Sequence, residues 1–207
     1  MTAPLIVGIS GATGAIYGVE LLRVLKKLRQ PTHLILSEMG QRTIDIETGI
    51  PLKEVRAMAD EVHNIKDLGS SIASGSCPTR GMVIAPCSIK TLSGIAHSFS
   101  YNLMIRAADV TLKEGRPLVL MVRETPLHKG HLELMAKASD IGAVIHPPMP
   151  AFYHKPETIT DIVHQGIGRV LDHLGVGHDL FERWQGGGRR PGPRLAKTNS
   201  NRPKGPL

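Results

Sequence analysis

Residues 5–18, LIVGISGATGAIYG, decide the fold. An apolar run at 5–9 ends in a turn that contains Gly8, Gly11 and Gly14, and an amphipathic segment follows directly. A strand that passes through glycines into a helix allows close backbone approach and offers unpaired N–H groups at the positive end of the helix dipole. The stretch therefore predicts a binding site for the phosphate of a nucleotide or flavin. A tight strand–helix packing turn without a ligand is the alternative.

The composition is that of a globular protein. The chain has 207 residues, enough for one domain with a sizeable core, and its hydrophobic content of 41% excludes disorder of the whole chain. No apolar run approaches the ~20 residues that span a bilayer. The N-terminal sequence shows no basic region or cleavage site, so we expect a cytoplasmic protein without a membrane partner.

The positive charge of the chain is concentrated at its C-terminal end. The net charge is +7, and six Lys and Arg residues, with no Asp or Glu, lie in the Gly/Pro-rich segment 185–207. The sequence therefore predicts one folded domain at 1–184 and a disordered basic tail at 185–207. Aromatic residues make up only 3%, too few for base-stacking platforms, so nucleic acid is not an expected partner.

Strand-like and helix-like segments alternate along the chain. Strands are expected at 5–9, 32–37, 81–86, 117–122 and 143–148. Helices are expected at 15–28, 38–47, 52–60, from about Ser88, and at 102–115, 131–142 and 157–175. This alternation predicts an α/β fold of three layers, with a mainly parallel sheet between two layers of helices.

Polar side chains follow four of the expected strands. Ser10 and Thr13 follow the first, Ser37 the second, Ser88 the third, and Arg123 with Glu124 the fourth. Ligands of parallel sheets bind at the carboxyl ends of the strands, so these side chains predict a site at one sheet edge. We expect Ser10 and Thr13 to add hydroxyl donors there and Ser88 to cap a helix.

Other polar groups are ambiguous by spacing alone. Arg106, Asp109 and Lys113 have the spacing of a solvated salt-bridge ladder on one helix. His128 and His131 lack a metal-binding motif, and Cys77 with Cys87 cannot form a metal tetrad, so no metal site is predicted. The two cysteines are expected to be buried free thiols.

A set of longer motifs carries a family resemblance. They are GISGATGAIYG at 8–18, LILSE at 34–38, ASGS at 73–76, APCSIKTLSGIA at 85–96, the run from Asn102 to His128, HLELMAKASDIGAV at 131–144 and PPMPAFYHKPETI at 147–159. Together they resemble the flavin prenyltransferase family (UbiX-like), in the branch that is paired with hydroxyarylic acid decarboxylases and named after phenolic acid decarboxylase. The resemblance covers about residues 4–184, and RAADVTLKEGRPLVLMVRE at 106–124 is its most specific part.

The resemblance implies a flavodoxin-like Rossmann fold and a homododecamer. It implies a prenyltransferase that binds reduced FMN and dimethylallyl monophosphate, without a metal. The prenyl group is joined to N5 and C6 of the flavin, and the product, prenylated FMN, is supplied to a UbiD-type decarboxylase.

The resemblance also implies roles for individual residues. The cofactor-binding residues are Gly11, Ala12, Thr13, Ser37, Ser88, Ile89, Lys90, Thr91 and Arg123. The prenyl-phosphate ligands are Arg106, Lys113, Arg123, Tyr153 and Arg169. The catalytic residues are Glu47 and Glu124, the acid–base carboxylates, together with Thr13, which stands where many members have serine.

Three alternatives remain at this point. A flavin-dependent cysteine decarboxylase would share the glycine turn, but 147–156 lacks the Asn and the Met-Trp ending of its recognition string. A short-chain dehydrogenase would need a Tyr-x-x-x-Lys pair, which none of the three tyrosines forms. A non-catalytic flavin-binding component of a phenolic acid decarboxylase would need the phosphate loops but not the prenyl-phosphate ligands.

Overall fold

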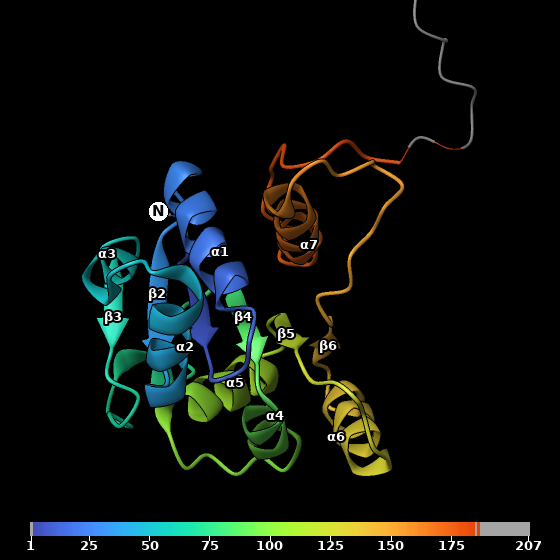
Figure 1. Cartoon of the computed structure of the whole chain (residues 1–207). Coiled ribbons are helices and arrows are strands. Elements are labelled where there is room, and N and C mark those ends of the chain that lie inside the picture. Colours follow the sequence, from blue (N-terminus) through green and yellow to red (C-terminus); the bar gives the residue numbers. More distant parts are fainter. Residues whose placement is uncertain (1, 185, 187–207) are drawn as a thin grey trace, which may run out of the picture.

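A computed structural model describes residues 2–184 and 186. Its core is a six-stranded sheet in the order β3-β2-β1-β4-β5-β6, with every pair parallel (Figure 1). The strands are β1 (Leu5–Ile9), β2 (Thr32–Leu36), β3 (Glu61–His63), β4 (Gly81–Cys87), β5 (Leu118–Val122) and β6 (Val144–Ile145). The predicted parallel α/β fold is confirmed. The predicted tail lies outside the described residues, Gly186 excepted.

Helices cover both faces of the sheet. The first face carries α1 (Ala15–Lys27), α2 (Glu38–Thr48), α3 (Leu52–Arg56) and α7 (Ile159–His173). The second carries α4 (Ile89–Ala96), α5 (Leu103–Lys113) and α6 (Lys129–Asp140), while η1 (Ser71–Ala73) packs beside α5. Within the described residues, no helix combines the length and the apolar character needed to cross a membrane.

Strand alternation builds two hydrophobic cores. In β1, Leu5, Val7 and Ile9 enter the core under α1 and α7, whereas Ile6 enters the core under α4 and α5. A strand buried on both faces has no polar side to show, which explains the continuous apolar runs of the sequence. Most predicted helices and strands therefore appear within a few residues of the expected positions.

The edge strand β3 was not predicted. The sequence favoured a helix over 52–60, but α3 ends at Arg56 and β3 begins at Glu61. A three-residue edge strand with exposed Glu61 and Val62 carries no apolar alternation, so pattern alone misses it. The two cysteines are free as expected, but only Cys87 is fully buried, because Cys77 is half-buried.

The strand order places a topological switch point between β1 and β4. The chain leaves β1 toward β2 and leaves β4 toward β5, and ligands of such sheets bind where the connections diverge. Gly14, with φ +93°, turns the chain into α1. A Cβ atom at Gly18 would lie 2.2 Å from the carbonyl oxygen of Ala85, so α1 packs against the backbone of β4.

Candidate functional site

Ser10 joins the ends of β1 and β4. Its hydroxyl donates to the carbonyl oxygen of Pro86 at 2.9 Å and accepts the N–H of Ser88 at 2.8 Å. The side chain is buried. The expectation that Ser10 would offer a free hydroxyl donor is therefore wrong, because both hydrogen bonds are used to hold the two strand ends together.

The glycine turn is closed by a carboxylate. Glu47, in the last turn of α2, accepts the backbone N–H groups of Gly14 and Ala15 at 2.8 and 2.9 Å. The sequence predicted unpaired N–H groups at this helix start, and that prediction is wrong for Gly14 and Ala15. A negative charge at the positive end of α1 is favourable, which explains the pairing. Glu47 thus lies beside the predicted phosphate turn of Gly11 to Thr13.

Serines cap the two helices that flank this turn. Ser37 directly follows β2 and accepts the N–H of Gly40 at 2.9 Å, and Ser88 directly follows β4 and accepts the N–H of Thr91 at 3.3 Å. The predicted cap at Ser88 is confirmed. Each cap fixes the first turn of a helix whose remaining N–H groups face the sheet edge. These two helix N-termini are suited to an anionic group.

The side chains of Ile89 and Lys90 lie on the side of α4 that faces α6. Both line a cavity of about 580 Å³ together with residues of α6, and the Lys90 ammonium lies 5.5 Å from the centre of the Tyr101 ring.

Arg123 and Glu124 follow β5 at the same edge. The Arg123 N–H donates to the carbonyl oxygen of Cys87 at 3.0 Å, and its guanidinium has no partner among the described residues. Glu124 is exposed, and one of its oxygens accepts the N–H of Thr125 at 3.0 Å. The edge thus presents one unpaired cation next to one accessible carboxylate.

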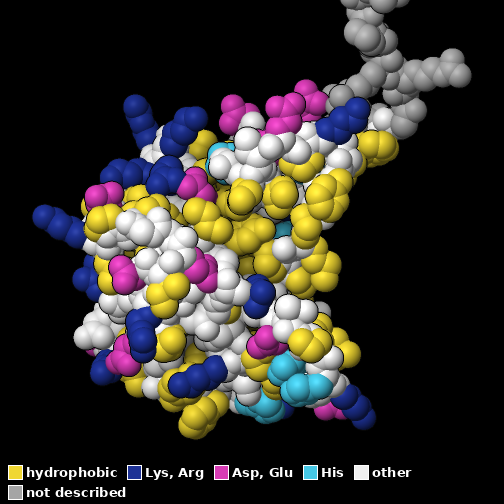
Figure 2. All heavy atoms as spheres, in the orientation of Figure 1, with side chains coloured by type: hydrophobic (Ala, Val, Ile, Leu, Met, Phe, Trp, Pro, Cys, Tyr) yellow, Lys and Arg dark blue, Asp and Glu magenta, His cyan; other side chains and the backbone are white. Residues whose placement is uncertain are grey.

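Tyr153 and Arg169 meet at a second part of the site. They line a cavity of about 670 Å³ with Phe181, Arg183 and Trp184. The Tyr153 hydroxyl accepts a hydrogen bond from Gln165 at 3.3 Å, and its ring lies edge-on to Trp184 at 5.8 Å. Figure 2 shows a hollow between the α7 and α6 regions, with hydrophobic side chains gathered on its α7 side. Cationic and aromatic groups together suit a phosphate that carries an apolar chain.

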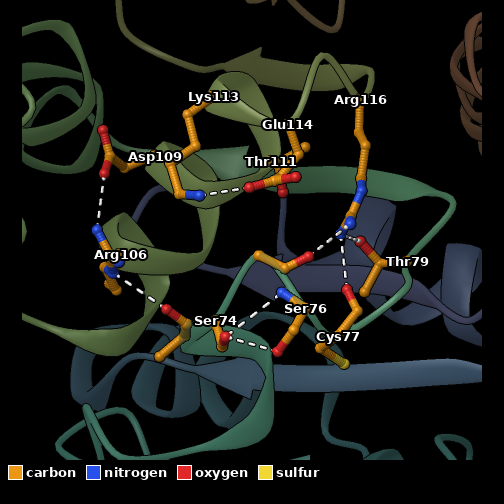
Figure 3. A network of polar contacts seen from close by, with 12 residues as sticks. Ser74, Ser76, Cys77, Thr79, Arg106, Asp109, Thr111, Lys113, Glu114 and Arg116 are labelled. Atoms are coloured by element: carbon orange, nitrogen blue, oxygen red, sulfur yellow. Dashed lines mark hydrogen bonds and ion pairs between the residues drawn. The ribbon is translucent and has the colours of Figure 1, made fainter.

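Arg106 and Lys113 belong to a different network (Figure 3). Arg106 forms the predicted ion pair with Asp109 at 3.0 Å and also donates to the carbonyl oxygen of Ala73. Lys113 pairs with Glu114 rather than with Asp109. Of these contacts, only the hydrogen bond from Arg106 to Ala73 attaches α5 to η1.

One chain does not bring the predicted prenyl-phosphate ligands together. Arg106 and Lys113 lie on α5, which packs on the second face of the sheet, whereas Arg169 lies on α7 on the first face. Sequence spacing cannot reveal this separation, because it depends on which side of the sheet each crossover passes.

A histidine pair that sequence analysis missed lies at the β2–β3 edge. His33 Nδ1 is 2.7 Å from His63 Nε2, and Glu61 lies beside both rings. Two imidazole nitrogens on one tetrahedral zinc stay about 3.3 Å apart, so the observed contact is a hydrogen bond. Ser70 bonds the other His63 nitrogen, and burial lowers the pKa of His63. The arrangement is that of a hydrogen-bonded pair rather than of a metal centre.

Comparison with known proteins identifies the family. The Flavoprotein family matches residues 2–171. The chain is 60% identical over 185 residues to flavin prenyltransferase UbiX of Salmonella typhimurium, and the match covers 88% of this chain and 98% of that protein. The chain belongs to the flavin prenyltransferase family. The resemblance found in the sequence is confirmed.

Two solved structures of relatives agree with the fold. A UbiX protein in complex with FMN and dimethylallyl pyrophosphate superposes with a TM-score of 0.88 at 45% identity, over 90% of this chain and 99% of that one. A dodecameric FMN-dependent UbiX-like decarboxylase from Escherichia coli O157:H7 superposes with a TM-score of 0.86 at 50% identity, over 88% and 100%.

Proposed function

We propose that this protein is a flavin prenyltransferase that joins the dimethylallyl group of dimethylallyl monophosphate to N5 and C6 of reduced FMN. The observation that carries the proposal is the 60% identity to a flavin prenyltransferase over nearly its whole length. The geometry supports it, because a phosphate-binding sheet edge, an unpaired arginine and an aromatic, cationic cavity are present among the described residues of one chain.

The residues at the sheet edge fit FMN. Its phosphate would be held by the capped helix N-termini at Ser37 and at Ser88 to Thr91, and by the turn at Gly11, Ala12 and Thr13. Arg123 would lie beside the flavin. When bound and reduced, FMN supplies the two nucleophilic atoms of the reaction.

The cavity beside α7 fits the prenyl donor. Arg169 and Tyr153 would bind its phosphate, with Arg123 approaching from the sheet edge. Departure of the phosphate needs fixed positive charge around the leaving dianion, and arginine supplies planar paired donors. The rings of Phe181 and Trp184 would cover the apolar allyl group and exclude water.

The carboxylates would handle protons. Bond formation at C6 releases a proton, and Glu124 at the sheet edge is the proposed acceptor. Glu47 and the Thr13 hydroxyl would act at the glycine turn. Glu47 keeps one oxygen available, since its hydrogen bonds to Gly14 and Ala15 both fall on Oε2.

We also propose that the working unit is an oligomer, as in the dodecameric relative. If Arg106 and Lys113 bind the prenyl phosphate, they must reach it from a second copy of the chain, because they lie across the sheet from Arg169. The proposed product, prenylated FMN, would serve a UbiD-type decarboxylase in the cytoplasm.

The decisive experiment is anaerobic incubation of the protein with reduced FMN and dimethylallyl monophosphate, followed by mass spectrometry of the flavin. We expect a flavin heavier by one prenyl group. Unmodified flavin would overturn the proposal. A decarboxylase is the second candidate, because one relative is named an FMN-dependent decarboxylase. Release of CO₂ from an aromatic acid or a cysteine-terminated peptide by the FMN-loaded protein alone would support it.

A further inference from the structure

Asp172 is the centre of a charged cluster on α7. Its Oδ2 accepts from Arg169 at 2.9 Å and from Arg183 at 3.0 Å. Its Oδ1 accepts from Arg183 at 2.6 Å and lies 3.1 Å from Nε2 of His178. One carboxylate therefore joins three side chains, two of which line the cavity assigned to the prenyl donor.

Asp172 remains ionised under ordinary conditions. Hydrogen bonding to the Arg183 guanidinium, helped by the charge of that group and by His178, lowers the pKa of Asp172 to about 2. The His178 side chain is 1% exposed, so one partner of Asp172 is buried, whereas its two arginine partners reach solvent. The ion pairs therefore persist across the whole neutral range.

The two arginines use Asp172 differently. Arg183 donates with both terminal nitrogens, in the paired geometry that guanidinium and carboxylate prefer. Arg169 donates with Nη1 alone, and among the described residues its Nε and Nη2 have no partner. Asp172 thus engages both terminal nitrogens of Arg183 but only one of Arg169, which keeps Nε and Nη2 for another anion.

Arg183 connects the aromatic wall of the cavity, which consists of Phe181 and Trp184, to α7. It stands between Phe181 and Trp184 in sequence, so its pairing with Asp172 fixes both rings relative to the helix. Gly168 leaves room for the Phe181 ring to pack against α7, because a Cβ atom at this position would lie 2.4 Å from the ring. Phe181 and Trp184 lie outside any helix or strand, so the hydrogen bonds of Arg183 to Asp172 are what hold this wall to the helix.

We propose that Asp172 is a positioning residue for the prenyl-phosphate site, acting through Arg169 and Arg183. It orients the Arg169 guanidinium toward the phosphate, and it holds Phe181 and Trp184 against Tyr153 over the apolar group. The ligand class, an allylic monophosphate, rests on the proposed function.

Two effects of Asp172 oppose each other. Its negative charge reduces the attraction of the cavity for an anion, whereas its hydrogen bonds order the groups that bind the anion. The Arg169 and Arg183 side chains are 47% and 55% exposed, so solvent screens the first effect. Ordering therefore dominates, and removal of the carboxylate weakens binding. If Asp172 acted through its negative charge alone, removal of the carboxylate would strengthen binding of the phosphate.

The test uses the FMN-loaded, oxidised protein, in which binding is measured without turnover. Dimethylallyl monophosphate is titrated by calorimetry into wild type, Asp172→Asn, Arg183→Gln and the double variant. We expect each single change to raise Kd about tenfold, the loss typical of one charge-assisted hydrogen bond. The double variant should be hardly weaker than either single one, because both changes break the same attachment.

Trp184 is the single tryptophan of the chain, so its fluorescence anisotropy reports on the wall without activity. We expect the anisotropy to fall in both single variants. Asp161→Asn is the matched control, since it removes the same charge from the first turn of α7, where Asp161 belongs to the capping box. It should lower the melting temperature and leave Kd and anisotropy unchanged.

Tighter or unchanged binding in Asp172→Asn, or additive losses in the double variant, would overturn the proposal. So would an unchanged Trp184 anisotropy. Failure of the proposed function is seen separately, as the absence of prenylated flavin from the wild type. The anisotropy comparison still decides whether Asp172 holds the wall in that case.

Discussion

The Glu47 carboxylate accepts the backbone N–H of Gly14 at 2.8 Å, so the end of α2 closes over the start of α1. The contact places a negative charge at the positive end of α1, where the glycine turn alone would suggest a phosphate. Because the Glu47 carboxylate already occupies this helix end, a phosphate would bind there less favourably. We therefore expect the flavin phosphate to depend more on the caps at Ser37 and Ser88 than on the first turn of α1.

Glu47→Gln should lower the free energy of unfolding by about 1 kcal/mol, because the amide keeps the shape but loses the charge that holds two backbone N–H groups. It should also slow prenyl transfer. Thermal melts and single-turnover rates measure the two effects. Unchanged stability would mean that the hydrogen bonds to the turn contribute nothing.

Glu124→Gln should slow the chemistry more than it weakens binding. Its carboxylate is accessible at the sheet edge next to Arg123, and a positioned base contributes ~10²–10⁴-fold to a proton transfer. Anaerobic single-turnover spectra should show slow product formation with FMN affinity retained. A wild-type rate would remove Glu124 from the mechanism and leave Glu47 as the candidate base.

Arg169→Ala and Tyr153→Phe should weaken binding of the prenyl phosphate while FMN binding stays intact. Both side chains line the cavity beside α7, away from the capped helix N-termini. Loss of one charge-assisted hydrogen bond costs ~1.5–3 kcal/mol. Calorimetric titrations with each ligand test the separation, and an equal loss of FMN affinity in both variants would refute it.

The centre of the sheet was predictable because β1, β4 and β5 are buried on both faces. Their sequences are apolar throughout, and Gly14 and Ser88 mark the starts of the helices that follow β1 and β4. The positions of Ser37, Ser88 and Arg123 at one edge follow directly from parallel strands. The sequence could not show which polar groups form hydrogen bonds within the protein. Ser10, for example, is hydrogen-bonded to Pro86 and Ser88.

The cavity beside α7 was less predictable. Arg169 and Tyr153 were named only through the family resemblance, and Asp172 and Arg183 were not named at all. Their contact joins residues eleven positions apart across the end of a helix, which no periodic pattern marks. Likewise, His33 and His63 come from two strands whose pairing depends on an edge strand that the pattern missed.

Stability should fall as the pH drops below about 6.5, the ordinary pKa of histidine. Burial lowers the pKa of His63 in the folded protein, partly opposed by the charges of Glu61 and Asp67. Below pH 6.5 the unfolded chain takes up a proton that the folded chain resists, so acid favours unfolding. Melting temperatures of wild type and His63→Asn between pH 8 and 5 test this. An equal slope in both would exclude His63.

Arg106 and Arg169 should act on one prenyl phosphate from two different copies of the chain. They lie on opposite faces of the sheet, on α5 and α7, so one chain cannot present both to one ligand. Arg106→Ala and Arg169→Ala should each be impaired alone. Oligomers that contain both variants should regain activity, because some sites combine an intact α5 with an intact α7.

Co-expression of the two variants with different tags, followed by purification on both tags, gives the mixed oligomers, and prenylated flavin is then quantified. The matched control mixes Arg106→Ala with Lys113→Ala. Both changes lie on α5, so every site receives a damaged helix and no activity should return. Recovery only in the first mixture would establish sites shared between subunits. Absence of recovery there, with both parents impaired, would show that the two arginines do not act on one ligand from separate copies.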